Sequence, residues 1–357
     1  MSRKSMIYFL IPVLAVLILL ILFFSTLIIT VAGFKPTEGK VSLTVNSDRI
    51  FQENDVLSII TWNLGYAGLG EESNFIADGG KSILPPSREI VQKNIINIAS
   101  FLQENSADIW LLQEVAKKSR LIFNLDIWQR LTQNSSEYNY AHSPTVKIPW
   151  FPIVGRLITG NAIFSIFQPY QVLRHNLPLE EKGFLGIFQQ KYNFMSAHFD
   201  LPSLKRQLIV VNLHLAAFDE GGKIRKKQLE KLRIFLLTEY EKGNYLIVGG
   251  DWNHRLTDTD FITTTEEKYL FWVHDLPADF TPAGWQWAFD ETVPTVRTLE
   301  RSYQPQENYT CIIDGFLLSP NLELLAVKGY DQQFKYSDHQ PVRVEIKLRS
   351  DRIKTYE

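Results

Sequence analysis

A short apolar run that ends in two glycines and two polar groups most constrains how this chain can fold. The run covers residues 245 to 254 and reads YLIVGGDWNH. Its apolar part is typical of a buried strand, and the Gly-Gly pair lets the backbone bend sharply where the strand ends. Because side chains alternate along a strand, Asp251 and Asn253 point to the same side. They could hold a water, a hard metal ion or a phosphate, but a solvated Asp/Asn turn has the same sequence.

The same arrangement, an apolar run ending in polar groups, recurs along the chain. The further groups are Asn63, Glu114, Asn212 with His214, Asp314, and Asp338 with His339. Taken alone, Glu114 could be a surface acid, and His214 could be a histidine of the core with its hydrogen bonds satisfied. Together, six strand ends of this kind indicate a common site, since ligands bind at the carboxyl ends of strands in α/β sheets. Acids without cysteine ligands suit a hard divalent cation, with Mg²⁺ expected and Mn²⁺ or Ca²⁺ as alternatives.

Alternating strand and helix patterns predict an α/β domain over residues 56–348, followed by a short tail at 349–357. Strands are expected at 56–62 and 107–112, with a helix at 87–105 between them, which makes a βαβ-like unit. Two more helices are expected, at 119–135 and 222–240.

The N-terminal segment is apolar enough to cross a membrane. No charged residue lies between Lys4 and Lys35, and roughly 20 apolar residues span a bilayer. The apolar core of a cleaved signal peptide is usually shorter, about 7–15 residues. Arg3 and Lys4 favour an N-terminus inside. We therefore expect a retained transmembrane helix within residues 1–34, a linker at 35–55, and a single-pass protein with an extracytoplasmic domain. A cleaved signal peptide is the alternative.

Charge and cysteine content narrow the partners only a little. A net charge of −2 gives no general argument for nucleic acid. The basic run from Lys223 to Lys227 could contact a phosphate backbone or form the solvated face of a helix. The single cysteine, Cys311, excludes an intrachain disulfide.

Two segments lack clear periodicity and are expected to serve binding. Residues 146–160 are apolar and aromatic but contain prolines and glycines, so they either pack under the domain or lie at a membrane surface. The long segment 255–309 contains Trp285, Trp287 and Arg297, which we expect to bind substrate. Trp285 and Trp287 could line a headgroup pocket or belong to the core.

Seven motifs together resemble the endonuclease/exonuclease/phosphatase superfamily, which has the deoxyribonuclease I-like fold. They are WNLG (62–65), LLQEV (111–115), GNAIFS (160–165), NLHL (212–215), GGDWN (249–253), IDGFLLS (313–319) and SDHQPV (337–342). They follow the superfamily's order over about residues 56–348. The resemblance implies a four-layer α/β sandwich, with two mixed β-sheets face to face and helices outside, and metal-dependent hydrolysis of a phosphoester.

The resemblance also implies residue roles on the metal side of the site. Glu114 is similar to the metal-binding glutamate, Asn63 to the group that supports the metal site, and Asp338 to a second metal-side carboxylate.

On the phosphate side, Asp251 and Asn253 resemble the pair that aligns the nucleophile and the phosphate. His339 resembles the histidine close to the phosphate, oriented by Asp314, and either a base or a cationic clamp. His214 matches a position on the leaving-group or phosphate side.

The expected function is membrane-anchored, metal-dependent hydrolysis of a phospholipid-like or other small phosphoester, as in sphingomyelinases. The expected partners are the lipid bilayer and the phosphoester, and the chain is expected to be a monomer. One alternative is a surface nuclease acting on DNA, for which the same site would serve. Another is a catalytically inactive interaction module on the same fold.

Overall fold

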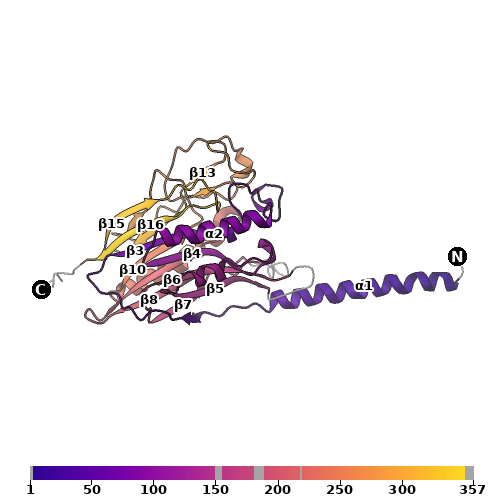
Figure 1. Cartoon of the computed structure of the whole chain (residues 1–357), viewed down its shortest axis with the longest axis horizontal. Coiled ribbons are helices and arrows are strands. Elements are labelled where there is room, and N and C mark those ends of the chain that lie inside the picture. Colours follow the sequence, from indigo (N-terminus) through magenta and orange to yellow (C-terminus); the bar gives the residue numbers. More distant parts are fainter. Residues whose placement is uncertain (1–2, 149–154, 181–188, 218, 350–357) are drawn as a thin grey trace.

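Two seven-stranded mixed β-sheets lie face to face and form the centre of the folded domain (Figure 1). The computed structural model describes residues 3–148, 155–180, 189–217 and 219–349. In one sheet the strand order is β1 (Gly39–Lys40), β7 (Gln171–Asn176), β8 (Asn193–Leu201), β9 (Arg206–His214), β10 (Tyr245–Asp251), β14 (Asp314–Leu318) and β11 (Gln286–Ala288).

The second sheet and one small ribbon complete the strands. The order is β15 (Leu322–Gly329), β16 (Val342–Leu348), β3 (Leu57–Asn63), β4 (Ile109–Lys117), β6 (Leu157–Ser165), β5 (Asn139–Ile148) and β2 (Leu43–Thr44). β12 (Val296–Arg297) pairs with β13 (Thr310–Cys311).

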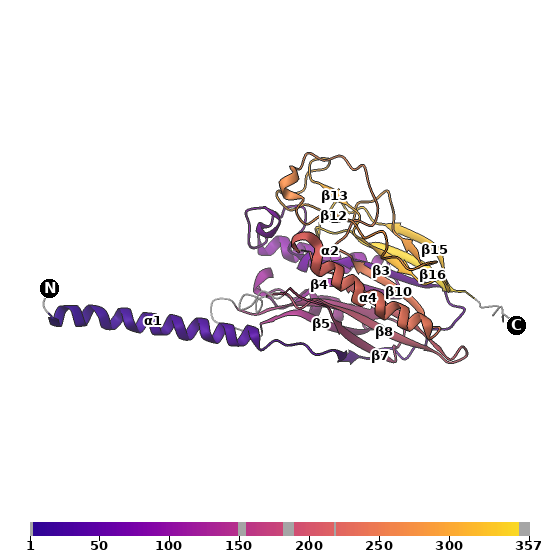
Figure 2. The same cartoon turned by 180° about the vertical axis from the view of Figure 1, so that it is seen from behind.

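Helices cover both outer faces of the sheet pair, as predicted. α2 (Arg88–Glu104) and α3 (Ile127–Gln133) pack on the sheet that holds β3 and β4, and α4 (Lys223–Glu241) packs on the sheet that holds β9 and β10 (Figure 2). Apolar side chains such as Ile59, Leu111 and Ile247 fill the space between the sheets. The four-layer sandwich is therefore confirmed.

The predicted helix at 119–135 is wrong as a single element. The structure has a 3₁₀ turn at Arg120–Ile122 and then the short helix α3. Phe123 and Asn124 between them have positive φ angles of 53° and 61°, which a right-handed helix does not allow. Asp126 then caps α3, since its side chain accepts a hydrogen bond from the amide of Gln129.

Part of the segment predicted as a linker at 35–55 pairs with the edges of the two sheets. Gly39 pairs with Arg174 at the edge of one sheet, and Leu43 pairs with Ala141 at the edge of the other. Phe51 is buried between the sheets. These residues escaped prediction because two-residue edge strands leave no periodic pattern.

The helix α1 (Arg3–Ala32) extends away from the domain along its long axis (Figure 1). Its stretch Tyr8–Thr30 has 23 residues and a mean hydropathy of 3.0. This is long and apolar enough to cross a membrane, a property that signal sequences share.

The two ends of the apolar segment at 146–160 are strand rather than loop. β5 extends to Ile148 and β6 begins at Leu157, so the segment's two ends form a hairpin. Its middle part, 149–154, lies outside the described residues.

Parallel strand pairs bring the predicted polar groups to one edge. β3 is parallel to β4, and β9 is parallel to β10. Their carboxyl ends carry Asn63, Glu114, His214 and Asp251. Because these sheets face each other across the core, the four side chains meet between them.

Candidate active site

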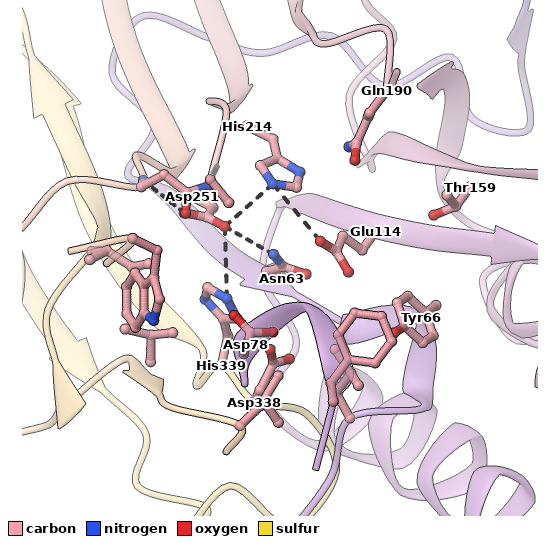
Figure 3. A pocket seen from close by; sticks show the side chains of 18 of the residues that line it. Asn63, Tyr66, Asp78, Glu114, Thr159, Gln190, His214, Asp251, Asp338 and His339 are labelled. Atoms are coloured by element: carbon pink, nitrogen blue, oxygen red, sulfur yellow. Dashed lines mark hydrogen bonds and ion pairs between the residues drawn. The ribbon is translucent and has the colours of Figure 1, made fainter. Parts of the chain in front are cut away.

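Asp251 lies at the centre of a pocket between the two sheets. Its side chain is buried, and Asn63 donates from Nδ2 to its Oδ2 at 3.0 Å. The other carboxylate oxygen accepts from the backbone amide of Asn253 at 2.9 Å. These two donors fix the carboxylate from opposite sheets. Figure 3 shows that Glu114, His214 and His339 point toward it.

Two imidazoles flank Asp251. Nε2 of His214 lies 3.6 Å and Nε2 of His339 lies 3.8 Å from Asp251 Oδ2. His339 is oriented by Asp314, whose Oδ2 is 2.9 Å from its Nδ1. Among the described residues Nδ1 of His214 finds no hydrogen-bond partner, although it is buried. The predicted residues therefore converge as a group.

Glu114 reaches the pocket because strand β4 is irregular there. The pairing of β4 with β6 shifts between Leu112 and Val115, and Glu114 has a φ of 53°. A bulge re-aims the side chain of the extra residue, in this case into the pocket. Asn253 also has a positive φ, 48°. Strained backbone at two predicted site residues is typical of functional sites.

Asp338 sits in a cradle formed by a glycine. A Cβ on Gly65 would lie 2.5 Å from Oδ1 of Asp338, and Gly65 has a φ of +46°. Only glycine fits both conditions. Ser337 donates to the same carboxylate oxygen at 3.3 Å.

The pocket holds an excess of acid over base. Burial, together with the charges of Asp338 and Asp251, raises the pKa of Glu114 to about 8. Burial likewise raises the pKa of Asp251 to about 7. Burial and the charge of Asp338 raise the pKa of Asp78 to about 7. A bound cation would relieve this repulsion.

The donor set fits a hard divalent cation. The closest group able to hold one comprises Asp251, Asp314 and His339, whose ligand atoms lie within 4.8 Å of one another. However, Asp314 already forms a hydrogen bond with His339, which is the arrangement of an oriented imidazole. Glu114 and Asp338 are carboxylates without such a commitment and suit the cation better. Asn63 donates from its side-chain nitrogen to Asp251 and does not offer the cation an oxygen ligand. In this arrangement Asn63 therefore positions Asp251.

The two imidazoles have opposite electrostatic surroundings. Burial lowers the pKa of His214 to about 3, and the charge of His339 adds to this. Burial also opposes charge on His339, but the carboxylates of Asp314, Asp251 and Asp338 outweigh it and raise its pKa well above the ordinary value. His214 is therefore neutral and His339 cationic at neutral pH.

Four residues singled out in the sequence make contacts that stabilise the fold, and not all of them line the pocket. Asn212 lies between the sheets and donates to the carbonyls of Leu112 and Ala162. Trp285 and Trp287 pack with the α4 side of the domain and do not line this pocket, and Trp287 lines a separate one. Their substrate role stays a prediction. Arg297 lines the pocket.

Its guanidinium, however, donates mainly to backbone carbonyls. The shortest of these hydrogen bonds runs from an Nη of Arg297 to Gly70 O at 2.7 Å. Arg297 thus holds the 65–86 loop beside the pocket.

Several residues that line the pocket were not predicted as site residues, among them Tyr66, Asp78 and Trp272. Tyr66 directly follows the WNLG motif, and its φ of 42° marks a strained turn. Asp78 comes from a glycine-rich loop with no periodic signal. Trp272 is buried, and among described residues its indole nitrogen has no hydrogen-bond partner.

Comparison with known proteins gives the fold and the family of the chain. A search of curated proteins found no match. Among solved structures, an endonuclease/exonuclease/phosphatase from Beutenbergia cavernae DSM 12333 is 17% identical with a TM-score of 0.51, over 83% of this chain and 72% of that one. The human Nocturnin catalytic domain with bound sulfate anion is 18% identical with a TM-score of 0.50, over 86% and 97%.

Truncated TDP2 from Caenorhabditis elegans is 15% identical with a TM-score of 0.50, over 83% of this chain and 99% of that one. At such low identity these three structures establish a shared fold. The model of the Endonuclease/Exonuclease/phosphatase family matches residues 60–339, which is most of the folded domain. The chain therefore belongs to the endonuclease/exonuclease/phosphatase family.

Proposed function

We propose that this chain is a membrane-anchored, divalent-metal-dependent phosphoesterase acting on a phospholipid-like or other small phosphoester, in the manner of a sphingomyelinase. The observation that carries the proposal is the convergence of Asp251, Glu114, His214 and the Asp314–His339 pair in one buried pocket. Mg²⁺ is the expected metal.

The acids and imidazoles divide the work of hydrolysis. A divalent cation at Glu114 and Asp338 would neutralise charge that builds on the phosphoryl oxygens. Asp251, held by Asn63 and Asn253, orients the attacking water and accepts its proton.

The histidines act on the other oxygens. Because Nδ1 of His339 is bonded to Asp314, its Nε2 is left to donate to a phosphoryl oxygen. His214 is assigned to the leaving-group or phosphate side. The bond from phosphorus to the leaving oxygen breaks as the bond to water forms, and the leaving oxygen takes up a proton from the solvent.

The lining of the pocket favours a substrate with an apolar part. Phe75, Leu121, Val146, Leu157 and Leu299 line it together with the acids. An apolar wall offers little to a charged nucleic-acid backbone.

Burial of the central arginine weakens the argument that the basic run from Lys223 to Lys227 contacts DNA. Arg225 is buried, and its Nη1 donates to the carbonyls of Asn253 and Trp272 at 2.9 Å each. Only lysines of this run are exposed on α4.

The test is a hydrolysis panel with the full-length chain in detergent. Sphingomyelin, inositol phosphates and plasmid DNA would each be offered with Mg²⁺, Mn²⁺ or Ca²⁺. Asp251→Ala is the active-site variant, and Asp258→Ala, at a nearly fully exposed side chain, is the matched control. Metal-dependent cleavage of sphingomyelin or another small ester by wild type and Asp258→Ala only is the expected result. Nicking of DNA alone would make the chain a nuclease, and no cleavage by a folded chain would leave an inactive module.

A further inference from the structure

The C-terminal part of α1 packs against the adjoining ends of strands β5 and β6. Phe23 and Leu27 of α1 and Leu157 of β6 all contact Ile148, the last residue of β5. Phe23 and Leu27 lie within the apolar stretch Tyr8–Thr30. With a rise of 1.5 Å per residue, they lie roughly 10 Å and 5 Å below the level of Thr30. If α1 spans a bilayer, whatever touches these residues lies at its surface or within it.

A short connection holds the domain close to α1. The amide of Gly33 bonds to Ile29 O at the helix end, and the carbonyl of Pro36 accepts from Nδ2 of Asn176 at 2.8 Å. Glu38 forms an ion pair with Lys231 of α4. Only residues 33–38 separate α1 from β1, so the domain has little freedom to swing away from the helix.

The pocket lies at the same end of the sandwich. Along β4 and β6, Val115 is opposite Gly160 and Lys117 is opposite Ile158. Glu114 is therefore about four strand positions, or roughly 13 Å, from Leu157. Leu157 also lines the pocket, so one side chain connects the pocket wall with the packing around Ile148. Figures 1 and 2 show α1 leaving the domain beside β5.

Basic side chains surround this end of the domain. Lys35 follows α1, Lys147 precedes Ile148, and Lys118 follows β4, and all three are exposed. Arg120 is also exposed, and its backbone amide bonds to Arg156 O at 2.8 Å, beside the hairpin. Basic residues next to an apolar surface are typical of contact with anionic lipid headgroups.

We infer that the hairpin end, meaning Ile148 and Leu157 with the basic residues Lys35, Lys118, Arg120 and Lys147, rests in the surface of the same bilayer that α1 spans. The pocket then opens toward that surface. Its substrates are phosphoesters whose apolar part stays in the membrane while the phosphate reaches Glu114 and Asp251. This inference rests on the proposed anchoring and phosphoesterase activity.

Membrane contact can be measured without any catalysis. A nitroxide would be attached to Lys147→Cys and, as the control, to Leu325→Cys, which is exposed on β15 at the opposite end of the domain (Figure 1). The native Cys311 is fully buried and its pKa is raised to about 12 by burial, so it does not compete for the label. The full chain is reconstituted in vesicles of phosphatidylcholine and phosphatidylglycerol.

The expected result is that the label at 147 is shielded from a water-soluble nickel complex and accessible to oxygen, while the label at 325 is open to the nickel complex. Equal access of the nickel complex to both labels would overturn the inference. Neither outcome depends on hydrolysis, so the measurement stands apart from the test of the proposed function.

A second experiment separates membrane contact from chemistry. Ile148→Asp and Lys147→Glu, neither of which lines the pocket, are compared with Leu325→Asp in the same vesicles doped with sphingomyelin. Hydrolysis of sphingomyelin is expected to fall by about tenfold in the first two variants, because contact with the lipid surface is weakened. Hydrolysis of water-soluble bis(4-nitrophenyl) phosphate is expected to stay unchanged. Lys147→Glu is an exposed change and keeps the test valid where Ile148→Asp fails to fold.

An equal loss on both substrates, or no loss on either, would contradict the inference. If the wild type hydrolyses neither substrate, the proposed function fails and the nitroxide measurement alone decides the membrane contact.

Discussion

Asp314 Oδ2 lies 2.9 Å from Nδ1 of His339, and the two residues come from opposite sheets, one at the start of β14 and the other just before β16. The contact fixes the imidazole so that Nε2 faces the pocket. Asp314→Asn keeps the shape of the side chain but removes its charge. We expect kcat to fall by at least about 10²-fold, because the imidazole loses the charged acceptor that fixes its tautomer and orientation. Steady-state hydrolysis of bis(4-nitrophenyl) phosphate measures this.

The same variant has a spectroscopic consequence. Since the charge of Asp314 helps to raise the pKa of His339, Asp314→Asn is expected to shift the His339 ring titration to lower pH in NMR spectra. Asp258→Asn is the control at an exposed position. An unchanged rate and an unchanged His339 titration in Asp314→Asn would contradict a role for the Asp314–His339 pair in the active site.

Gly65→Ala is expected to weaken metal-dependent activity. The added Cβ would lie 2.5 Å from Oδ1 of Asp338 and push the carboxylate away from the pocket. Displacing a metal-side carboxylate should raise the metal concentration needed for half-maximal rate by about 10-fold or more. Gly39→Ala is the matched control, because Gly39 also has a positive φ but a Cβ added there would meet no atom within 4 Å. Equal metal dependence in both variants would contradict the claim that Gly65 makes room for the Asp338 carboxylate.

The strand-end residues could be predicted because each follows an apolar run, and parallel strands bring their carboxyl ends to one edge. Glu114 and Asp251 carry this local signal, whereas His339 precedes the last strand, β16. Asp78 does not carry this signal, since a glycine-rich loop brings it to the pocket through contacts distant in sequence. Trp285 shows what a sequence pattern leaves open. An aromatic residue in a long loop looks available for binding, but it packs against Tyr240 of α4 in the core.

Arg225 shows the same limit for charge patterns. The sequence places it in a basic run on a helix, where a solvated side chain is the usual outcome. Only the tertiary structure brings the carbonyls of Asn253 and Trp272 to its guanidinium. Buried partners of this kind have no sequence signature, because both acceptors are backbone atoms.

Arg225→Met should therefore destabilise the domain. It leaves the buried carbonyls of Asn253 and Trp272 without donors, and hydrogen bonds from charged groups contribute about 1.5–3 kcal/mol each. We expect the free energy of unfolding to fall by about 2–4 kcal/mol, measured by urea denaturation in detergent. Lys226→Met removes a neighbouring exposed charge and should change stability by less than about 0.5 kcal/mol. A similar loss of unfolding free energy in both variants would mean that the hydrogen bonds of Arg225 do not stabilise the domain.

The partly buried histidine His142 should make the domain sensitive to acid. Its Nε2 lies 3.1 Å from the carbonyl of Val115, and burial together with Lys117 lowers its pKa to about 3. In the unfolded chain the pKa is about 6.5. Above pH 6.5 both states are neutral and His142 has no effect on pH dependence. As the pH falls from about 6.5 toward 3, the unfolded state binds one more proton than the folded state, and the free energy of unfolding falls.

The variant His142→Gln tests this. Its unfolding should take up about one proton fewer than that of the wild type between pH 6 and 4, measured by urea denaturation at several pH values. Lys118→Gln, an exposed loss of charge nearby, should leave that slope unchanged, and an unaltered slope in His142→Gln would show that this histidine is not held neutral.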